Sequence, residues 1–167
     1  MNIYGYFRIS TAKQSIDRQI RNIKAEYPTA HIVQEAYTGT SIFRPEWLKL
    51  YRILKSGDTV VFDSVSRMSR NAEEGFALYE DLYHKGIRLV FLKEHHIDTE
   101  TYKKALSGSI AMTGTNVDFI LKGINEYLMA LAKEQIKLAF EQSEKEVADL
   151  HQRTREGLLT ARLNGKQ

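Results

Sequence analysis

Short β-prone segments alternate with helical segments over the first 92 residues, and this alternation constrains the fold more than any other feature. Strands separated by helices predict a mostly parallel central sheet with helices on both faces. In such sheets, reactive groups gather beyond the carboxyl ends of the strands. We therefore expect an α/β domain. The four β-prone segments are Ile3 to Phe7, His31 to Tyr37, Val60 to Phe62, and Ile87 to Leu92.

The intervening segments have helical spacing or loop composition. The apolar residues from Ile16 to Tyr27 recur on one helical face, and a proline follows them. Pro45 begins a helix to about Leu54, and a third helix with an apolar face ends at Gly86. Polar loops are expected at Thr38 to Arg44 and at Ser64 to Asn71.

A long helix is expected near the carboxyl end, because Ile124 to Glu156 contains neither glycine nor proline. If continuous, it is about 50 Å long, longer than the domain before it. Such a helix needs a partner, so we expect a dimerisation helix; the alternative is a helix folded back on its own domain. The chain then divides into an α/β domain over 1–123 and a helix over 124–167. Its apolar stripe comprises Ile136, Phe140, Val147, Leu150, Leu158 and Ala161.

Composition excludes several classes of protein. The absence of cysteine rules out disulfides, a cysteine nucleophile and thiolate zinc sites. The strongly apolar runs, such as Leu89 to Leu92, are too short to cross a bilayer, so we expect a cytoplasmic protein without a membrane partner. A net charge of +3 is compatible with a nucleic-acid partner but does not establish one.

The end of the first strand carries the first candidate site. Arg8 and Ser10 are two residues apart, so their side chains can lie on the same side and approach one substrate. Taken alone, Ser10 is more often a helix cap or turn residue, and Thr11 with Gln14 fits a capping box.

The loop after the third strand carries the second candidate site. Arg67 and Arg70 are three residues apart, which places two guanidinium groups on one face of a helical turn. An isolated pair of this kind is more often a solvated basic turn. However, Arg8 and Arg44 also lie at predicted loop positions on the same side of the sheet. Four arginines and one hydroxyl can meet the electrostatic needs of phosphoryl transfer without a metal or other cofactor.

These residues resemble the nucleophile motif and paired arginines of the serine recombinase family, the resolvases and invertases. The resemblance covers about Asn2 to Leu92 and returns near Glu146 to Gly157. Its most specific part is the run from Tyr6 to Ser10, followed by Gln14 and Gln19. Arg44 before Pro45 matches the family's loop arginine, and Glu146 matches its glutamate on the long helix.

The resemblance implies cleavage of double-stranded DNA by Ser10, with a 5′-phosphoserine link and strand exchange within a tetramer built from homodimers. It implies no metal, ATP or small-molecule substrate. On physical grounds Arg8, Arg67 and Arg70 stabilise the oxyanion and Arg44 positions the phosphate. Gln14 and Gln19 hold the loop or its arginines, and Glu146 is assigned to the substrate-binding group.

Three residues depart from the family pattern. Ser66 stands where many members have aspartate, Ser64 where many have lysine, and Val147 where arginine commonly follows the glutamate. An apparent insertion at about Glu100 to Asn125 also separates the last strand from the family-like helix, and its small polar residues suggest a mobile loop. These departures permit a second hypothesis, a recombinase-like assembly protein that has lost its chemistry.

The end of the long helix is basic, which suits the phosphates of a DNA minor groove; a solvated helix end is the alternative. The basic residues are Arg153, Arg155, Arg162 and Lys166. No base-reading module is recognisable, so we expect that the part that selects the DNA site is missing from this chain. We set aside a metal site at Glu94 to Asp98, because adjacent histidines on an extended segment point to opposite faces. A flavodoxin-like signalling domain is disfavoured, since the first strand lacks an acidic phosphoacceptor pair.

Overall fold

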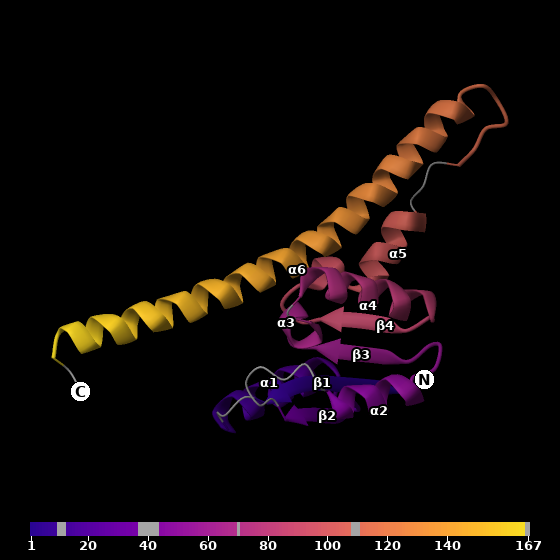
Figure 1. The fold of residues 1–167 in the computed structure, drawn as a ribbon. Coiled ribbons are helices and arrows are strands. Elements are labelled where there is room, and N and C mark those ends of the chain that lie inside the picture. Colours follow the sequence, from indigo (N-terminus) through magenta and orange to yellow (C-terminus); the bar gives the residue numbers. More distant parts are fainter. Residues whose placement is uncertain (10–12, 37–43, 70, 108–110, 166–167) are drawn as a thin grey trace.

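The computed structural model describes residues 1–9, 13–36, 44–69, 71–107 and 111–165. Its centre is a four-stranded parallel sheet with the order β2-β1-β3-β4 (Figure 1). The predicted parallel sheet is therefore confirmed. The strands are β1 (Ile3–Ile9), β2 (His31–Ala36), β3 (Thr59–Phe62) and β4 (Arg88–Phe91).

Helices cover both faces of this sheet. Phe7 and Val61 point to one face, where they pack with Ile23 of α1 (Lys13–Glu26). Tyr6 and Phe62 point to the other face, toward the larger core. That core includes residues of α2 (Pro45–Ile53), α3 (Val65–Met68), α4 (Ala72–His84), α5 (Thr99–Ser107) and α6 (Asp118–Leu163).

Two segments expected as loops contain helices. The segment predicted as a polar loop after β3 includes α3, a single turn of four residues. The apparent insertion is partly helical as well, because it contains most of α5 and the start of α6. A 3-10 turn, η1 (His95–Ile97), precedes α5.

The long helix begins at Asp118, six residues before the predicted boundary at 124. Its first carboxylate fixes the preceding turn: Asp118 Oδ1 accepts from the Thr113 amide at 2.7 Å, and Oδ2 accepts from the Gly114 amide at 2.8 Å. Gly114 has φ of 76°, a conformation that glycine adopts without strain. The turn therefore sets where the helix starts.

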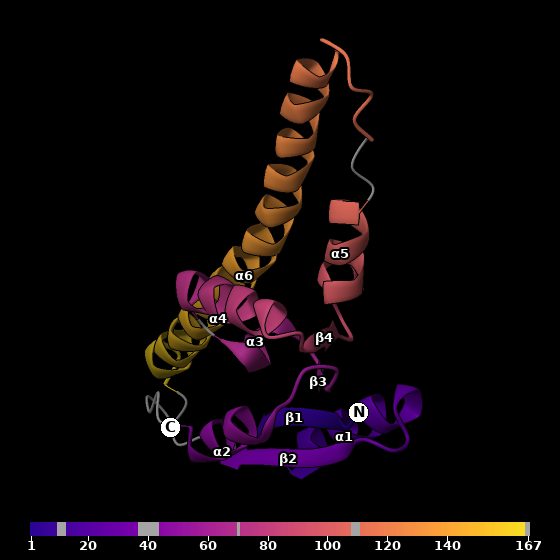
Figure 2. The same cartoon turned by 90° about the vertical axis from the view of Figure 1, so that its right-hand side faces the viewer.

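The predicted long helix is confirmed, and its 46 residues correspond to about 69 Å. Its middle packs on its own domain, because Ile136, Ala139 and Phe140 are buried in the larger core. Both ends project beyond the sheet and its helices (Figures 1 and 2). The alternative prediction, a helix folded back on its own domain, therefore holds for the middle of α6. Near the carboxyl end of the helix, Leu158 is exposed. Within the described residues, no helix is both long and apolar enough to span a bilayer.

Candidate active site

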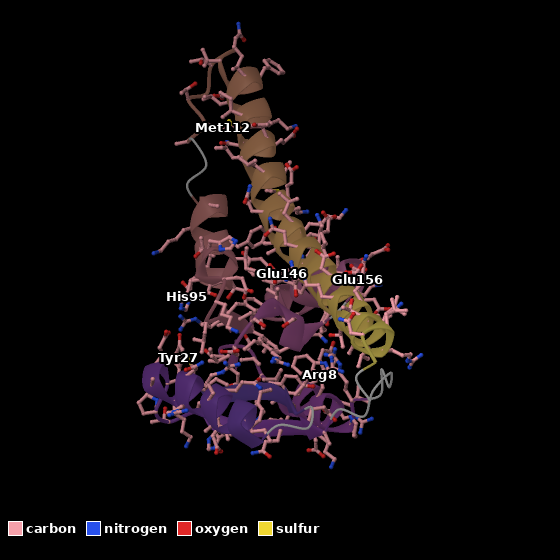
Figure 3. All side chains as sticks on the ribbon, turned by 90° about the vertical axis from the view of Figure 1, so that its left-hand side faces the viewer. Arg8, Tyr27, His95, Met112, Glu146 and Glu156 are labelled. Carbon is pink, nitrogen blue, oxygen red and sulfur yellow. The ribbon has the colours of Figure 1, made fainter. Side chains whose placement is uncertain are left out.

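The candidate site lies at the carboxyl edge of the sheet, where β1 and β3 end. Arg8 is the penultimate residue of β1, is in register with Glu35 of β2, and is only 5% exposed (Figure 3). Ser10 follows β1 but lies outside the described residues, as does Arg70. The described part of the site is therefore built from Arg8 and the groups around it.

Glu35 organises the space between β1 and α2. Its side chain is 1% exposed, and its Oε2 atom accepts hydrogen bonds from the Trp47 amide at 2.8 Å and the Tyr6 hydroxyl at 3.4 Å. Trp47 is the third residue of α2, so the carboxylate satisfies an amide that the helix itself leaves unpaired. Glu35 thereby fixes the amino end of α2 against β1.

Arg44 immediately precedes α2 and links this end of the helix to α3. Its Nη1 atom donates to the carbonyl oxygen of Met68, the last residue of α3. Since Glu35 fixes α2, it also holds the residue that carries this guanidinium. Arg44, which the sequence predicts to orient the phosphate, therefore forms a hydrogen bond to the short helix that carries Arg67.

The Tyr6 hydroxyl reports the local electrostatics. Burial raises the pKa of Tyr6 far above its ordinary value of 10.0; the charges of Arg44 and Arg8 oppose this shift, and Glu35 adds to it. Both guanidinium groups therefore act on the same hydroxyl. Arg8 and Arg44, which are 36 positions apart in the sequence, therefore both lie near the Tyr6 hydroxyl.

Arg67 belongs to α3, which is held by groups on both sides. Glu94 Oε2 accepts from the Val65 amide at 3.1 Å, at the first residue of the turn. Ser64 and Ser66 form a hydrogen bond between their hydroxyls at 2.6 Å. The Arg67 side chain is partly buried and its Nε atom is shielded from water. This turn thus presents Arg67 at the end of β3.

The helical turn that carries Arg67 is shorter than the sequence predicts, and Arg70 lies outside the described residues. The helix ends at Met68, and Ser69 is extended, with φ of −155° and ψ of 150°. The Ser69 hydroxyl donates to the Asn71 carbonyl at 2.9 Å and accepts from the Asn71 amide at 3.2 Å. These local bonds compete with helix continuation, as serine side chains commonly do.

The remaining predicted positioning groups have different environments. Gln19 on α1 is 1% exposed, and its amide oxygen is shielded from water. The Gln14 side chain lies outside the described part of the structure. Glu146 on α6 is exposed, and its charge helps to raise the pKa of Glu94 (Figure 3). Burial is the main cause of that increase.

The basic end of α6 projects past the carboxyl edge of the sheet (Figure 1). Arg153, Arg155 and Arg162 are exposed there, whereas Lys166 lies outside the described residues. Glu156 marks the same end of the helix in Figure 3. Because these three arginine side chains are exposed to solvent, they can contact a large polyanion.

The Glu94 to Asp98 segment is a 3-10 turn rather than an extended segment. His95 Nδ1 lies 2.7 Å from Asp98 Oδ2, and Nε2 lies 3.6 Å from Glu26 Oε2. The hydrogen bond to Asp98 is the main cause of a raised pKa at His95. This histidine therefore joins the turn to α1. Among the residues that the structure describes, no group of three potential ligands could hold a metal ion.

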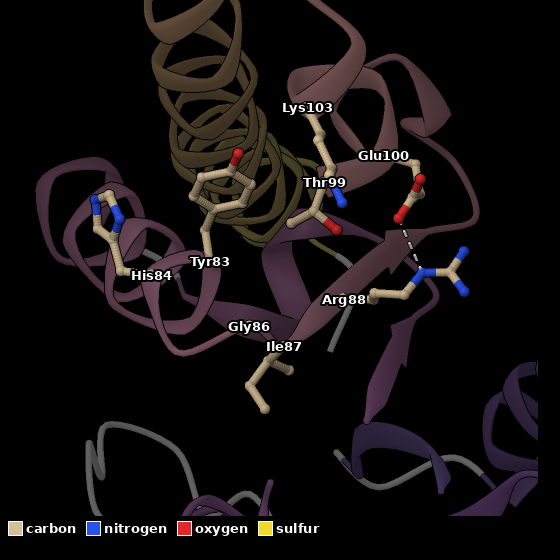
Figure 4. Close-up of a pocket in the computed structure, with 8 residues that line it drawn as sticks. All are labelled: Tyr83, His84, Gly86, Ile87, Arg88, Thr99, Glu100 and Lys103. Atoms are coloured by element: carbon tan, nitrogen blue, oxygen red, sulfur yellow. Dashed lines mark ion pairs between the residues drawn. The ribbon is translucent and has the colours of Figure 1, made fainter. Parts of the chain in front are cut away.

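A hollow of about 330 Å³ lies beside the amino end of β4, away from the candidate site (Figure 4). Its lining includes Tyr83, His84 and Lys103. Arg88 and Glu100 also line it, and they form an ion pair at 3.2 Å. Because the hollow lies at the amino end of β4, it is at the opposite end of the sheet from the arginine-rich edge.

Sequence reasoning missed the supporting carboxylates Glu35 and Glu94. The available signal was an acidic residue at the end of each of two β-prone segments, where a carboxylate can cap a neighbouring helix or turn. Their partners, Trp47 and Val65, are 12 and 29 positions away. The pairing therefore required the tertiary fold.

Comparison with known proteins identifies relatives of this chain. The chain is 27% identical over 159 residues to the transposon Tn21 resolvase of Escherichia coli, covering 92% of this chain and 83% of the relative. It is 28% identical over 166 residues to a resolvase of Clostridium perfringens, covering 98% and 74%. A resolvase family site-specific recombinase from Streptococcus pneumoniae aligns over 96% of this chain and 97% of its own, with 20% identity and a TM-score of 0.46. Residues 3–136 match the family model for the resolvase N-terminal domain, so this chain belongs to the resolvase family of serine recombinases.

Proposed function

We propose that this chain cuts and rejoins double-stranded DNA through Ser10, by way of a covalent 5′-phosphoserine intermediate. The observation that carries the proposal is the gathering of Arg8, Arg44 and the Arg67 turn at the edge that β1 reaches one residue before Ser10. The charges come from three separate segments of the chain. Membership of the resolvase family supports the same chemistry.

In the proposed step, Ser10 Oγ forms a bond to phosphorus and the bond from phosphorus to the 3′-oxygen breaks. The serine proton is lost, and the leaving 3′-oxygen gains a proton. Negative charge develops on the phosphoryl oxygens, where Arg8, Arg67 and Arg70 stabilise it and Arg44 orients the group. Reversal of the step reseals the strand. No external energy source is needed, because the phosphodiester bond is exchanged for another phosphate ester.

The supporting residues hold the catalytic groups in place and do not take part in making or breaking bonds. Gln19, buried on α1, and Gln14 hold the segment around Ser10, and Glu35 holds Arg44 through α2. Such restraint matters because small displacements of a catalytic group cost large factors in rate. Glu146, exposed on α6, belongs to the same group of predicted residues, and its negative charge helps to raise the pKa of Glu94.

We further propose that the end of α6 contacts the DNA minor groove through Arg153, Arg155, Arg162 and Lys166. Two copies pair through α6, and two pairs assemble on DNA for strand exchange. The residues before α6 form the catalytic body, and a separate module selects the recombination site. The exposed arginines on a helix that projects past the candidate site support this arrangement.

The test is formation of a covalent protein-DNA adduct on nicked duplexes drawn from the DNA that flanks the gene. We expect an adduct that survives denaturation in the wild type and disappears in Ser10→Ala. Arg67→Ala and Arg44→Lys should slow adduct formation by about 100-fold or more, because each removes a placed donor. Arg52→Ala is the matched control, since Arg52 is exposed on the last turn of α2.

The measurement also separates the second hypothesis. An assembly protein without chemistry forms no adduct, and its DNA-dependent association does not change in Ser10→Ala. An adduct that persists in Ser10→Ala would place the nucleophile elsewhere. Equal loss of activity in Arg52→Ala and Arg67→Ala would show that the arginines act through overall charge.

A further inference from the structure

Arg67 and Arg70 belong to one short segment, residues 65–72, which we call the arginine segment. Its backbone is held from outside at two points before Arg70. Glu94 accepts a hydrogen bond from the first amide of the segment, and Arg44 donates to the carbonyl oxygen at position 68. The first part of the arginine segment is therefore fixed by β4 and α2, the elements that these two side chains adjoin.

A third contact holds the arginine segment after Arg70. The Oε2 atom of Glu144, on α6, accepts a hydrogen bond from the Ala72 amide at 3.0 Å. Ala72 is the first residue of α4 and is only 8% exposed, so its amide has no acceptor within the helix and little access to water. Asn71 caps the same end of α4 but accepts from the Glu74 amide instead. The Glu144 carboxylate therefore supplies the acceptor that the Ala72 amide lacks, at a helix end that favours negative charge.

Close packing of α4 and α6, which lie side by side, brings Glu144 to this amide (Figures 1 and 2). The Phe140 ring occupies the space that a Cβ atom on Gly75 would fill. Ala72 is three residues before Gly75, and Glu144 is four residues after Phe140, so each pair lies on one face of its helix. The hydrogen bond is thus the next contact of the same interface. Because a hydrogen bond tolerates little change in distance, it ties the start of α4 to one position of α6.

We propose that Glu144 is a positioning residue for Arg70, an inference that rests on the proposed cleavage of DNA. The hydrogen bond fixes the Ala72 amide, two residues from Arg70, and so limits where the backbone can place the guanidinium group. The Ser69 hydroxyl adds to this restraint through its two hydrogen bonds to the backbone of Asn71. Glu144 does not touch DNA or the reacting atoms in this role. It acts through the arginine segment.

The alternative role for the amino end of α4 is to bind a DNA phosphate directly, since helix amino ends attract anions. The charges around this end oppose that role. Glu73 and Glu74 lie in the first turn of α4, and Glu144 already occupies the Ala72 amide. Three carboxylates repel a phosphate group. The amino end of α4 therefore suits a restraint on the arginine segment better than it suits an anion site.

The first test measures the hydrogen bond itself, through hydrogen exchange of the Ala72 amide in the complete chain without DNA. Glu144→Ala should speed this exchange by about 10-fold or more, because the amide loses its acceptor. Glu144→Gln keeps a carbonyl oxygen and should change the exchange rate by less than about threefold. Glu141→Ala is the matched control, since Glu141 is exposed three residues earlier on α6 and its removal changes the charge equally. It should leave the exchange rate unchanged.

The second test measures the rate of covalent adduct formation on a nicked duplex at saturating DNA, separately from DNA affinity. Glu144→Ala should slow adduct formation by about 10-fold or more, because Arg70 is placed less well, and Glu144→Gln should restore most of the rate. Glu141→Ala should keep the wild-type rate. The DNA affinities of Glu144→Ala and Glu141→Ala should agree within about threefold, because neither carboxylate contacts DNA in this role.

A double-mutant cycle identifies the arginine through which Glu144 acts. Lysine at position 70 keeps the positive charge but lacks the planar fork of donors, so precise placement of this side chain matters less. In Arg70→Lys, Glu144→Ala should therefore slow adduct formation further by less than about threefold. Additive effects of the two substitutions would overturn the assignment to Arg70.

The remaining outcomes separate this role from the proposed cleavage. If Glu144→Ala changes neither the exchange of the Ala72 amide nor the rate of adduct formation, the positioning role is wrong and the cleavage by Ser10 stands. The role is also overturned if only the exchange changes. A wild type that forms no adduct would refute the cleavage, and the positioning role with it. Circular dichroism confirms that each variant is folded.

Discussion

Replacement of Gly75 by alanine tests the packing that places α6 beside the candidate site. A Cβ atom at this position of α4 would lie 2.6 Å from Cδ1 and Cε1 of Phe140 and 3.1 Å from Cβ of Ser69. The Phe140 ring is 1% exposed and packs edge-on against Phe91, with ring centroids 6.5 Å apart. The ring therefore cannot move aside without disturbing the core.

Two opposing effects set the magnitude of this change. Overpacking a well-filled interior costs about 1–3 kcal/mol, whereas alanine is favoured over glycine within a helix by about 1 kcal/mol. We expect Gly75→Ala to reduce the free energy of unfolding by about 0–2 kcal/mol. For a chain of this size, this corresponds to a fall in Tm of up to about 8 °C.

The assay is thermal unfolding of a double-mutant cycle with Phe140→Leu. Since the smaller side chain makes room for the new methyl group, the two substitutions should be coupled by about 0.5–3 kcal/mol. Gly157→Ala on α6 is the matched control, because a Cβ atom there meets nothing within 4 Å. It should raise Tm. If Gly75→Ala raises Tm to the same extent, or if the cycle is additive, α4 and α6 do not approach as closely as described.

Two further predictions concern pH. Burial pushes the pKa of Asp58 up, but hydrogen bonds from the Asn2 and Lys55 amides, both at 2.9 Å, lower it overall. The charged Asp58 carboxylate therefore stabilises the fold above pH 3.8, and this stabilisation is lost as the pH falls further. Asp58→Asn should lower Tm at pH 7 but have little effect near pH 2. Burial raises the pKa of Glu94, so its charged form weakens the fold at neutral pH. Glu94→Gln, which keeps an acceptor for Val65, should stabilise by at most about 1 kcal/mol at pH 7, and this advantage should vanish in titrations below pH 4.5. If either substitution changes Tm equally at neutral and at low pH, the pKa shift described for that carboxyl group is wrong.

The larger elements could be predicted because each has a period or a stop signal. Ile20 and Ile23 share the helical face expected for α1, and Pro45 begins α2 as expected. The four residues of α3 are too few to show a period, so its bounds could not be predicted, although the spacing of Arg67 and Arg70 indicated a helical turn. The start of α6 depends on hydrogen bonds from Thr113 and Gly114 to Asp118, in a segment whose composition indicates only a loop.

The cationic part of the site could be predicted more readily than its supports. Parallel strands bring their carboxyl ends to one edge, so the sequence predicts that Arg8 and Arg44 share a phosphate site there. The charges of both residues act on the Tyr6 hydroxyl, and the phosphate site itself stays a prediction. The link from Arg44 to Met68 could not be predicted, because it joins a side chain to a backbone carbonyl. The spacing of Arg67 and Arg70 predicted a helical turn that includes both, but α3 ends at Met68, one residue after Arg67.

The balance of charge at the carboxyl edge explains why Glu35, which supports α2 there, is acidic and buried. Arg8 and Arg44 repel each other, and the Glu35 carboxylate, 1% exposed and near both, offsets part of that repulsion. In the proposed function, the phosphate of DNA relieves the repulsion that remains between Arg8 and Arg44, whereas a neutral ligand does not.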